Sequence, residues 1–432
     1  MVVTVWPNPE KDRLNTSVPV VVINDYDGHG HNVAQSLGRL GIPVYGVHAD
    51  AHSPAARSRY WRENFIWDFE QAPADESVDW LLQLARRIGP RPILIPTSDT
   101  SCLFVADHAA ALREGFLFPK QPAGLARALS SKKQMYCLCK KYAIPTPETV
   151  FPQSLHDVVE FLTRATFPVM LKRIDYSACS GTDIRVVLAQ DAAAVLKHYD
   201  KMEAPDIANF MLQEYIPGGS EMVWMFNGYF DEESRCVFGL TGKKIRQGYR
   251  PYTGMTSLGM CVTNHTVARQ TKDFMKAIGY QGILDIGYKC DVRTGQYKLL
   301  DANPRIGATF RLFVDTCGLD VARVLYRDLT GQPVSPGMPR EGRKRVVEDY
   351  DVASALMLYR DGNLGVREWI RSFQGVQETC WLARDDPAPF FAMAQRSLHV
   401  VSQTAIRKSL TCMSRRPSRG FCVTVGERHE YN

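Results

Sequence analysis

The sequence predicts an α/β protein of several domains, and three observations carry that prediction. Strand and helix patterns alternate over roughly the first 120 residues, which is typical of a parallel, doubly wound sheet. A glycine-containing loop follows the first apolar strand, between Asn24 and Gly30. Farther along, a predicted hairpin places two aspartates and an asparagine on one face. The 432 residues suffice for about two to four domains with buried cores.

Composition and charge narrow the class of protein. The apolar fraction of 45% and the charged fraction of 23% are those of a soluble globular protein. A net charge of +6 suits anionic small molecules and is too diffuse to indicate nucleic acid as a partner. No apolar run approaches the ~18 residues of a membrane helix, and the N-terminus lacks the order of a signal peptide. The 11 cysteines, an odd number without a C-x-x-C pair, indicate reduced thiols in the cytoplasm.

The first strand and helix form a βαβ pattern. A buried strand is predicted over Val18–Ile23, followed by a helix that ends at Gly41 and a strand over Pro43–Val47. A dinucleotide-binding turn would need a third glycine, and Val33 occupies that position. Two interpretations stay open: a turn that gathers substrate near a helix N-terminus, and a tight turn without a ligand. The histidines in this loop have no third metal ligand nearby in the sequence.

The alternation continues through the rest of this region. A helix near Val78–Ile88, a strand over Pro92–Ile95 and a helix across Ser101–Glu114 are expected. Functional loops of parallel sheets lie beyond the carboxyl ends of the strands. The loops Asp25–His31 and Thr97–Asp99 are therefore candidates for substrate contact.

A lysine at a strand end marks the next segment. After a helix from Ser131 to about Tyr142, a strand over Phe167–Lys172 leads into the polar loop Asp175–Thr182, and Ile184–Leu188 reads as the returning strand. Backbone N–H groups, hydroxyls and a lysine together suit a lid over a phosphate chain. An exposed hairpin with a surface lysine is the alternative.

Two weaker motifs follow. A strand ending at Gln213–Ile216 precedes a Pro-Gly-Gly turn and Glu221, where backbone groups can read a purine edge and a carboxylate can accept from a ribose. Beyond it, a basic run (Lys243, Lys244, Arg246 and Arg250) precedes Pro251–Gly259, which reads as flexible. The default interpretation of this run is a solvated face, and its rival is anion binding.

The hairpin carries the clearest chemistry. Apolar runs at Ile283–Tyr288 and Tyr297–Leu300 flank the turn Asp291–Gly295. With an odd number of residues in the loop, Asp285 lies opposite Asp301, and Asn303 shares their face. Oxygen ligands of this kind suit Mg²⁺ that bridges substrate phosphates. Solvated aspartates on an ordinary hairpin are the alternative; because Asp301 follows two leucines, a solvated charge is not expected there.

In this order the motifs resemble those of the ATP-grasp superfamily. There, an acidic residue on one strand precedes an acidic-x-Asn-Pro-Arg run on the next, as Asp285 precedes Asp301-Ala-Asn-Pro-Arg305 here. The second acid is more often glutamate, so Asp301 is a departure. The resemblance implies a Rossmann-like domain over residues 1–124, an ATP-grasp domain over 125–331 and a C-terminal extension over 332–432. Within the ATP-grasp domain it implies a lid subdomain at about 125–208 and a metal-binding subdomain at about 209–331.

The resemblance also implies roles for individual residues. Lys132, or Lys133 in its place, and Lys172 correspond to phosphate-binding lysines, and Ser180 and Gly181 to the lid. The adenine hinge and ribose acceptor correspond to Gln213, Glu214, Tyr215, Ile216 and Glu221. The magnesium ligands correspond to Asp285, Asp301 and Asn303, and Arg305 to an arginine that steadies the transferring phosphoryl group, with Arg246 and Arg311 as further candidates for charge stabilisation.

The implied activity is that of a carboxylate–amine ligase similar to D-aspartate ligase-type members. Such a ligase uses ATP and either one or two Mg²⁺ ions, for which Mn²⁺ can substitute. Its reaction passes through an acyl phosphate. Its partners are a small carboxylate and an amine, and a homo-oligomer is left open. An ATP-grasp phosphotransferase and a nucleotide-binding protein without turnover are the alternatives. In the C-terminal part the sequence predicts helices over Val314–Gly331, Val352–Arg360 and Gly365–Phe373, and a basic tail (Arg407, Lys408, Arg415, Arg416 and Arg419).

Overall fold

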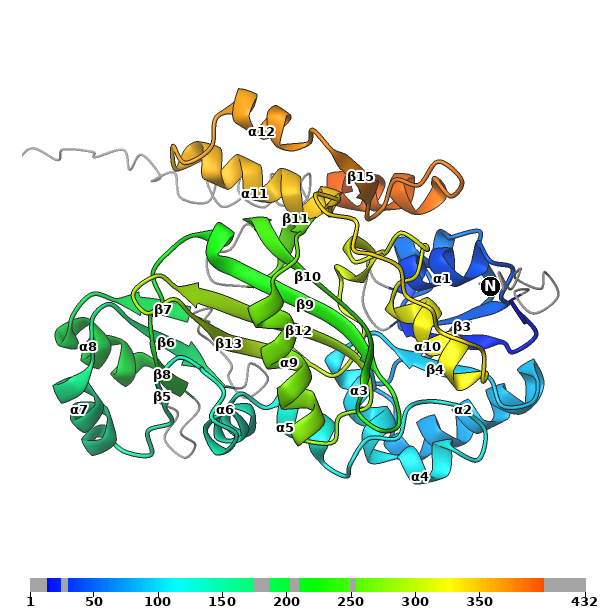
Figure 1. The fold of residues 1–432 in the computed structure, drawn as a ribbon, viewed down its shortest axis with the longest axis horizontal. Helices are drawn as coiled ribbons and strands as arrows, with labels where there is room; N and C mark the ends of the chain where they lie inside the picture. The colour runs from blue at the N-terminus through cyan, green and yellow to red at the C-terminus, as the bar shows by residue number, and fades with distance from the viewer. Residues whose placement is uncertain (1–13, 25–29, 175–185, 203–209, 249–253, 400–432) are drawn as a thin grey trace, which may run out of the picture.

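Three sheets organise the chain (Figure 1). The computed structural model describes residues 14–24, 30–174, 186–202, 210–248 and 254–399. The N-terminal sheet lies at one end, a small sheet lies at the other, and a large sheet occupies the middle. The functional groups of the predicted site come from all three parts, so the arrangement of the sheets decides which residues meet.

The N-terminal domain is a four-stranded parallel sheet in the order β3-β2-β1-β4. Its strands are β1 (Val20–Asn24), β2 (Val44–His48), β3 (Trp61–Ile66) and β4 (Ile93–Pro96), and its helices are α1 (Gly30–Gly38), α2 (Ala74–Ile88), α3 (Asp99–Asp107) and α4 (Ala109–Leu112). This confirms the predicted α/β class. Strand β3 was not predicted from the sequence, because it carries exposed polar residues at Arg62–Asn64 and no apolar alternation.

The small sheet is antiparallel, in the order β5-β8-β6-β7. It consists of β5 (Thr149–Val150), β6 (Val169–Arg173), β7 (Val186–Ala189) and β8 (Phe210–Glu214), with α7 (Leu155–Arg164) and α8 (Ala192–Met202) packed on it. Ser154 and Asp157 form a capping box that begins α7. The predicted lysine strand is β6, so Lys172 lies next to the strand's last residue.

The large sheet has seven strands in the order β13-β12-β9-β10-β11-β14-β15. They are β9 (Val223–Phe230), β10 (Cys236–Gln247), β11 (Thr256–Cys261), β12 (Gly282–Asp291), β13 (Gln296–Asn303), β14 (Lys344–Val346) and β15 (Val376–Thr379). All neighbours are antiparallel except β14 and β15. The helices α5 (Leu125–Ser130), α6 (Lys132–Lys141) and α9 (His265–Ala277) contribute to one apolar cluster with β9, β12 and β13.

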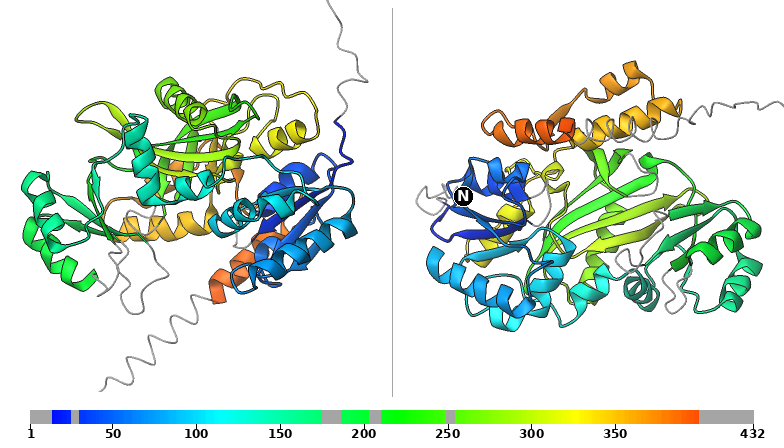
Figure 2. Two further views of the ribbon diagram at one scale, coloured as in Figure 1. Left: turned by 90° about the horizontal axis from the view of Figure 1, so that it is seen from below. Right: turned by 180° about the vertical axis from the view of Figure 1, so that it is seen from behind.

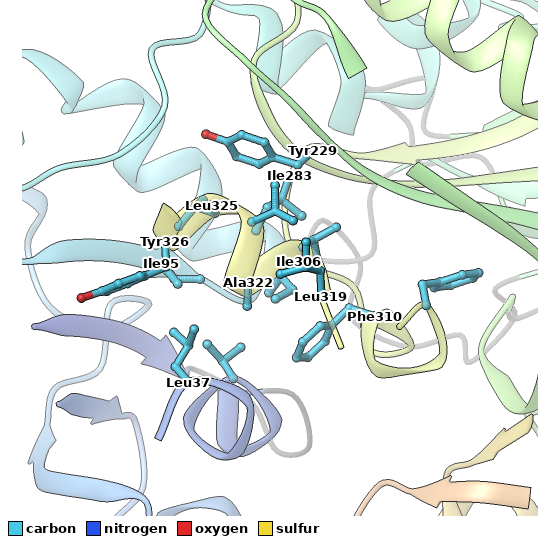
Figure 3. Packing of buried hydrophobic residues seen from close by; sticks show 14 of the residues in the cluster. Leu37, Ile95, Tyr229, Ile283, Ile306, Phe310, Leu319, Ala322, Leu325 and Tyr326 are labelled. Carbon is cyan, nitrogen blue, oxygen red and sulfur yellow. The ribbon is translucent and has the colours of Figure 1, made fainter. Parts of the chain in front are cut away.

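A continuous core joins the N-terminal domain to the large sheet (Figure 3). Leu37 of α1 and Ile95 of β4 belong to the same cluster as Tyr229 of β9 and Phe310, which begins a short 3₁₀ helix at Phe310–Leu312. The helix α10 (Val321–Leu329) packs its buried face into this cluster. The loop that follows β13 is thereby held between the two domains.

The C-terminal part lies along the far edge of the large sheet and reaches α1, as both other views also show (Figure 2). It contains α11 (Glu348–Arg360) and α12 (Val366–Ser372) beside β14 and β15. The Arg246 guanidinium of β10 donates to both oxygens of Asp351 on α11, at 2.7 and 3.0 Å. This contact ties the extension to the sheet.

Three local predictions need correction. The helix predicted over Val314–Gly331 is only α10, because the chain turns at Gly318 (φ +79°) and Asp320 caps the helix. Part of the segment predicted as flexible, Thr256–Gly259, belongs to β11. Lys244 and Arg246 are buried in β10 and do not form a solvated face. None of the described helices is long and apolar enough to cross a membrane.

Candidate active site

The β12–β13 hairpin brings its three oxygen-bearing side chains together, in a register different from the predicted one. Asp285 pairs with Asn303, and Asp301 pairs with Gly287, because a bulge follows Gly287. Asp301 and Asn303 still share a face, and the Asn303 amide donates to the Asp301 carboxylate at 3.4 Å. Asp301 is exposed, so the expectation that this charge is shielded from solvent was wrong. The face therefore opens toward solvent at Asp301.

Asp285 is the inner carboxylate of this face. Desolvation, together with the negative charge of Asp301, raises its pKa to about 6, although Arg305 and Lys244 oppose the shift. Gly307 lies directly against it, since a Cβ at Gly307 would come within 2.2 Å of the Asp285 Oδ2 atom. The negative charge of Asp301 beside Asp285 is a local excess of negative charge, which a cation relieves.

Asn227 on β9 lies beside these residues and was not predicted from the sequence. It pairs with Asp285 across the sheet and is fully buried. Neither its amide nitrogen nor its amide oxygen meets a hydrogen-bond partner at standard distance, although the amide is close enough to lower the pKa of Asp285. Buried amides are normally satisfied, so this side chain is suited to a ligand. The available signal was an asparagine inside an otherwise apolar strand.

Lysines of the small sheet, of α6 and of β12 itself lie close to the acidic face of the hairpin. The pKa of Lys172 is lowered to about 8 by desolvation and by the positive charge of Lys132, with Lys289 adding to the effect and Asp301 opposing it. The Lys172 ammonium donates to the Gln213 side-chain oxygen at 2.6 Å. The small sheet and α6 thus bring the positive charges of Lys172 and Lys132 close to the acidic face. Lys289 was not predicted.

Two further basic residues, Arg305 and Lys244, lie close to the Asp285 carboxylate. The Arg305 Nε atom donates to Asp99 at 2.6 Å, which joins the loop after β4 to the loop after β13. Lys244 is buried, and its pKa is lowered by desolvation while Asp301 and Asp285 oppose that shift. Its ammonium donates to the carbonyl of Gly254. The loop Thr97–Asp99, nominated from the sheet topology, therefore reaches the acidic hairpin through Arg305.

The predicted hinge residues lie along the end of β8 and the turn after it. Gln213 and Ile216 are buried, and the Lys289 ammonium lies 5.3 Å from the centre of the Tyr215 ring. The Glu214 carboxylate accepts from Lys298 at 2.9 and 2.8 Å and from Arg293, so it braces β8 against the hairpin. Glu221 is exposed and accepts from the Gly219 N–H at 3.0 Å.

The chain resembles one named ligase in sequence and others in fold. No protein-family model matches the chain. The chain is 24% identical over 329 residues to the D-aspartate ligase of Enterococcus faecium, covering 72% of this chain and 76% of that protein.

The same architecture occurs in solved structures. The L-amino acid ligase of Bacillus licheniformis matches with a TM-score of 0.55 at 12% identity, covering 75% of this chain and 78% of that one. The biotin carboxylase domain of Hydrogenobacter thermophilus 2-oxoglutarate carboxylase, solved with MgADP and bicarbonate, matches with a TM-score of 0.55 at 15% identity, covering 75% and 72%. This is the ATP-grasp fold.

Two arginines predicted for the ATP-grasp site are engaged elsewhere. Arg246 is held by Asp351 and Ser372. Arg311 donates to Asp320 at 2.5 Å and to Glu378 at 2.7 Å. A guanidinium already neutralised by buried carboxylates has little charge left for a substrate. Among the three arginines, Arg305 is the one that acts directly on the Asp285 carboxylate.

Some predicted parts of the ATP-grasp site lie outside the described residues. These are Ser180 and Gly181 of the lid, most of the loop Asp25–His31, Arg250 and the basic tail. Among the described residues, no group of three or more His, Cys, Asp or Glu side chains is arranged to hold a metal ion. The candidate ATP-grasp metal site thus depends on two carboxylates and amide oxygens, the donor set that hard cations accept.

Proposed function

We propose that the chain is an ATP-dependent ligase that joins a carboxylate to an amine through an acyl phosphate, releasing ADP and phosphate. The observation that carries the proposal is the meeting of Asp285, Asp301 and Asn303 with Lys172, which belongs to a different sheet. An acidic face opposed by lysines across a gap is what a magnesium–nucleotide complex requires. The likeness to a protein named D-aspartate ligase supports the same activity.

The residues of the hairpin fit Mg²⁺. Asp285, Asp301 and Asn303 would hold it, and the unpartnered amide of Asn227, which lies opposite Asp285, would orient that carboxylate. When bound, Mg²⁺ neutralises charge on the phosphates and favours attack at phosphorus. The match to a structure solved with MgADP supports this choice of cofactor.

The nucleotide would lie between the small and the large sheet. The end of β8 offers backbone groups and the apolar side chain of Ile216 to a base, and Glu221 offers a carboxylate to a ribose hydroxyl. Lys132 and Lys172 would bind the phosphate chain. A pKa of about 8 leaves most of Lys172 charged at neutral pH, as phosphate binding requires.

The reaction then has two steps. A carboxylate oxygen of the substrate forms a bond to the γ-phosphorus while the bond to the β–γ bridging oxygen breaks and ADP leaves. The amine nitrogen next attacks the acyl carbon, loses a proton, and phosphate leaves with the electron pair of the broken C–O bond. Arg305, which lies close to Asp285, would stabilise the developing negative charge in both steps. We assign the activated carboxylate to an amino acid, because the two ligases that the chain is similar to act on amino acids by name.

Replacing the outer carboxylate tests the proposal. Asp301→Ala should lower ADP release at least ~100-fold, since it removes a charged metal ligand, whereas residues that only orient a ligand change activity by 10–100-fold. ADP release with a panel of amino acids and amines measures this. Asp273→Ala on the exposed face of α9 is the matched control and should retain full activity. Retained turnover in Asp301→Ala would contradict the metal assignment.

Hydroxylamine separates the alternatives. A ligase that forms an acyl phosphate gives a hydroxamate when hydroxylamine replaces the amine, because the activated acyl carbon is attacked by the added nucleophile. A phosphotransferase that makes a phosphate ester gives ADP without a hydroxamate. A nucleotide-binding protein without turnover binds ATP and releases no ADP with any substrate.

A further inference from the structure

Lys289 on β12 lies on the same face of the hairpin as the two candidate metal-binding carboxylates. Asp285, Gly287 and Lys289 are spaced two residues apart, so they share this face, and each of them is partly exposed. Gly287 lies opposite Asp301, and Lys289 follows two residues, or ~7 Å, farther along the strand. The Lys289 side chain is therefore accessible from the side of the sheet that carries the carboxylates.

The residue opposite Lys289 is also a lysine, and its charge is neutralised. The Lys298 ammonium lies 2.8 Å from the Glu214 carboxylate and 3.0 Å from the Asp291 carboxylate. Arg293 pairs with the same two carboxylates, so the charges of these four side chains cancel.

Lys289 has no ion pair of its own in the part of the chain that the structure describes. Like charges directly opposite each other on a sheet are unfavourable, and here only Lys298 has carboxylates to compensate it. Lys289 thus leaves an uncompensated positive charge on an accessible face. An anion that enters the gap between the small and the large sheet can reach it.

The neighbours of Lys289 are residues assigned to different parts of the nucleotide. Its ammonium lies 5.3 Å from the centre of the Tyr215 ring, in the turn that would hold the base. Desolvation lowers the pKa of Lys289, and the Glu221 carboxylate, which would bind the ribose, is close enough to oppose that shift. Lys172, whose pKa is lowered by desolvation and by Lys132, also feels the positive charge of Lys289. Lys289 is therefore close to the groups for the base and ribose and to those for the phosphates.

We propose that Lys289 binds the α-phosphate of the nucleotide. The proposal rests on the proposed ligase function and adds to it a phosphate contact made by the large sheet. The α-phosphate joins the ribose to the β- and γ-phosphates, so it lies between the ribose at Glu221 and the metal at Asp285 and Asp301. An accessible ammonium without a carboxylate partner is suited to a phosphate oxygen, which it meets as a point charge.

A structural role for Lys289 predicts a different outcome. In that case the ammonium would only hold the turn after β8 against the hairpin, through its contact with the Tyr215 ring. Its removal would then weaken every ligand that needs this turn, including a nucleoside without phosphate. A phosphate contact affects only ligands that carry the α-phosphate.

AMP and adenosine test the proposal, because they differ by the α-phosphate alone. Calorimetry of the full chain without Mg²⁺ should show that the wild type binds AMP more tightly than adenosine. Lys289→Met should reduce this ratio of dissociation constants about 10-fold or more, the effect of one hydrogen bond to a charged group. The affinity for adenosine should stay the same.

Matched variants separate the phosphate contact from folding and from net charge. Lys289→Arg keeps the charge and should retain most of the preference for AMP, whereas Lys289→Gln should lose it as Lys289→Met does. Lys276→Met, at an exposed position near the end of α9, removes one positive charge elsewhere and should leave the ratio unchanged. Equal losses of AMP and adenosine affinity in Lys289→Met would overturn the proposal, and so would an unchanged ratio.

The binding measurement keeps this proposal separable from the proposed function. If the preference for AMP depends on Lys289 while no pair of carboxylate and amine supports ADP release, the ligase proposal fails and the phosphate contact stands. If ADP release is observed while Lys289→Met binds AMP and adenosine as the wild type does, the phosphate contact fails and the ligase proposal stands.

Discussion

At the scale of single residues, unsatisfied buried groups mark the site better than charge alone. Asn227, fully buried on β9, has both polar atoms of its amide without a partner beside Asp285. Such a group costs about 1–3 kcal/mol of stability if nothing satisfies it. Functional sites commonly hold such groups, because the residue that serves the ligand is not optimised for the empty fold.

Replacing Asn227 should therefore separate stability from activity. Asn227→Leu keeps the branching and the number of side-chain heavy atoms and removes the unsatisfied polar atoms, so the free energy of unfolding should stay level or rise by about 1–3 kcal/mol. Activity should fall 10- to 100-fold, with a higher Mg²⁺ concentration for half-maximal ADP release, because Asp285 loses a neighbour that orients it.

A second asparagine provides the contrast. Asn264→Leu removes the cap that accepts from the Val267 N–H at 3.0 Å, so stability should fall by about 1 kcal/mol with activity unchanged. Urea unfolding and magnesium titrations of both variants measure the difference. A destabilised, fully active Asn227→Leu variant would contradict the assignment.

At the scale of elements, two basic residues of β10 have different surroundings. Lys244 acts on the acidic hairpin, whereas Arg246 is locked to Asp351 of α11 with side-chain exposures of 5% and 1%. Ser257, Trp369 and Ser372 satisfy the remaining groups of this pair. The pair attaches the C-terminal extension to the sheet, which explains why a basic residue is buried there.

Breaking that pair should cost stability and leave the chemistry intact. Asp351→Asn leaves the buried Arg246 without its counter-charge and should lower the free energy of unfolding by about 3–5 kcal/mol. The double variant Arg246→Met with Asp351→Leu should be more stable than Asp351→Asn, because no unpaired charge remains. Denaturant unfolding gives the stabilities. Loss of ADP release in the folded double variant would restore the catalytic role that the resemblance implied for Arg246.

At the scale of the whole molecule, the C-terminal extension contacts the N-terminal domain. The His31 ring of α1 stacks on Trp381 with 4.6 Å between centroids and bonds the Cys380 carbonyl at 2.9 Å. Burial, together with the positive charge of Arg345, lowers the pKa of His31 to about 4, although the Cys380 carbonyl and Asp386 oppose the shift. This contact between α1 and the extension therefore needs a neutral imidazole.

Acid should weaken this contact in a defined window. An unfolded chain binds a proton at His31 near pH 6.5 and the folded chain only near pH 4, so stability is present above about 6.5 and is lost as pH falls toward 4. The difference in pKa corresponds to about 3 kcal/mol. His31→Phe keeps an aromatic ring and removes the titration, so its unfolding midpoint in urea should depend less on pH between 4 and 6.5. An unchanged slope would show that other groups carry the acid sensitivity.

The sequence by itself determined the strands and helices that periodicity marks, and the order of the chemical groups along the chain. It placed Asp285, Asp301 and Asn303 on one hairpin face and Lys132 and Lys172 opposite them, because these follow from local patterns and a resemblance. Only the tertiary structure decided the register, since a bulge after Gly287 is a property of the packed sheet. It alone showed that Arg246 and Arg311 pair with carboxylates away from the hairpin, whereas Arg305 lies close to Asp285. It also disclosed the unsatisfied polar atoms of Asn227 and Arg345. The groups that meet at these positions come from distant parts of the chain, as Asn32 and Arg345 do. No local sequence pattern can therefore indicate which buried polar group lacks a partner.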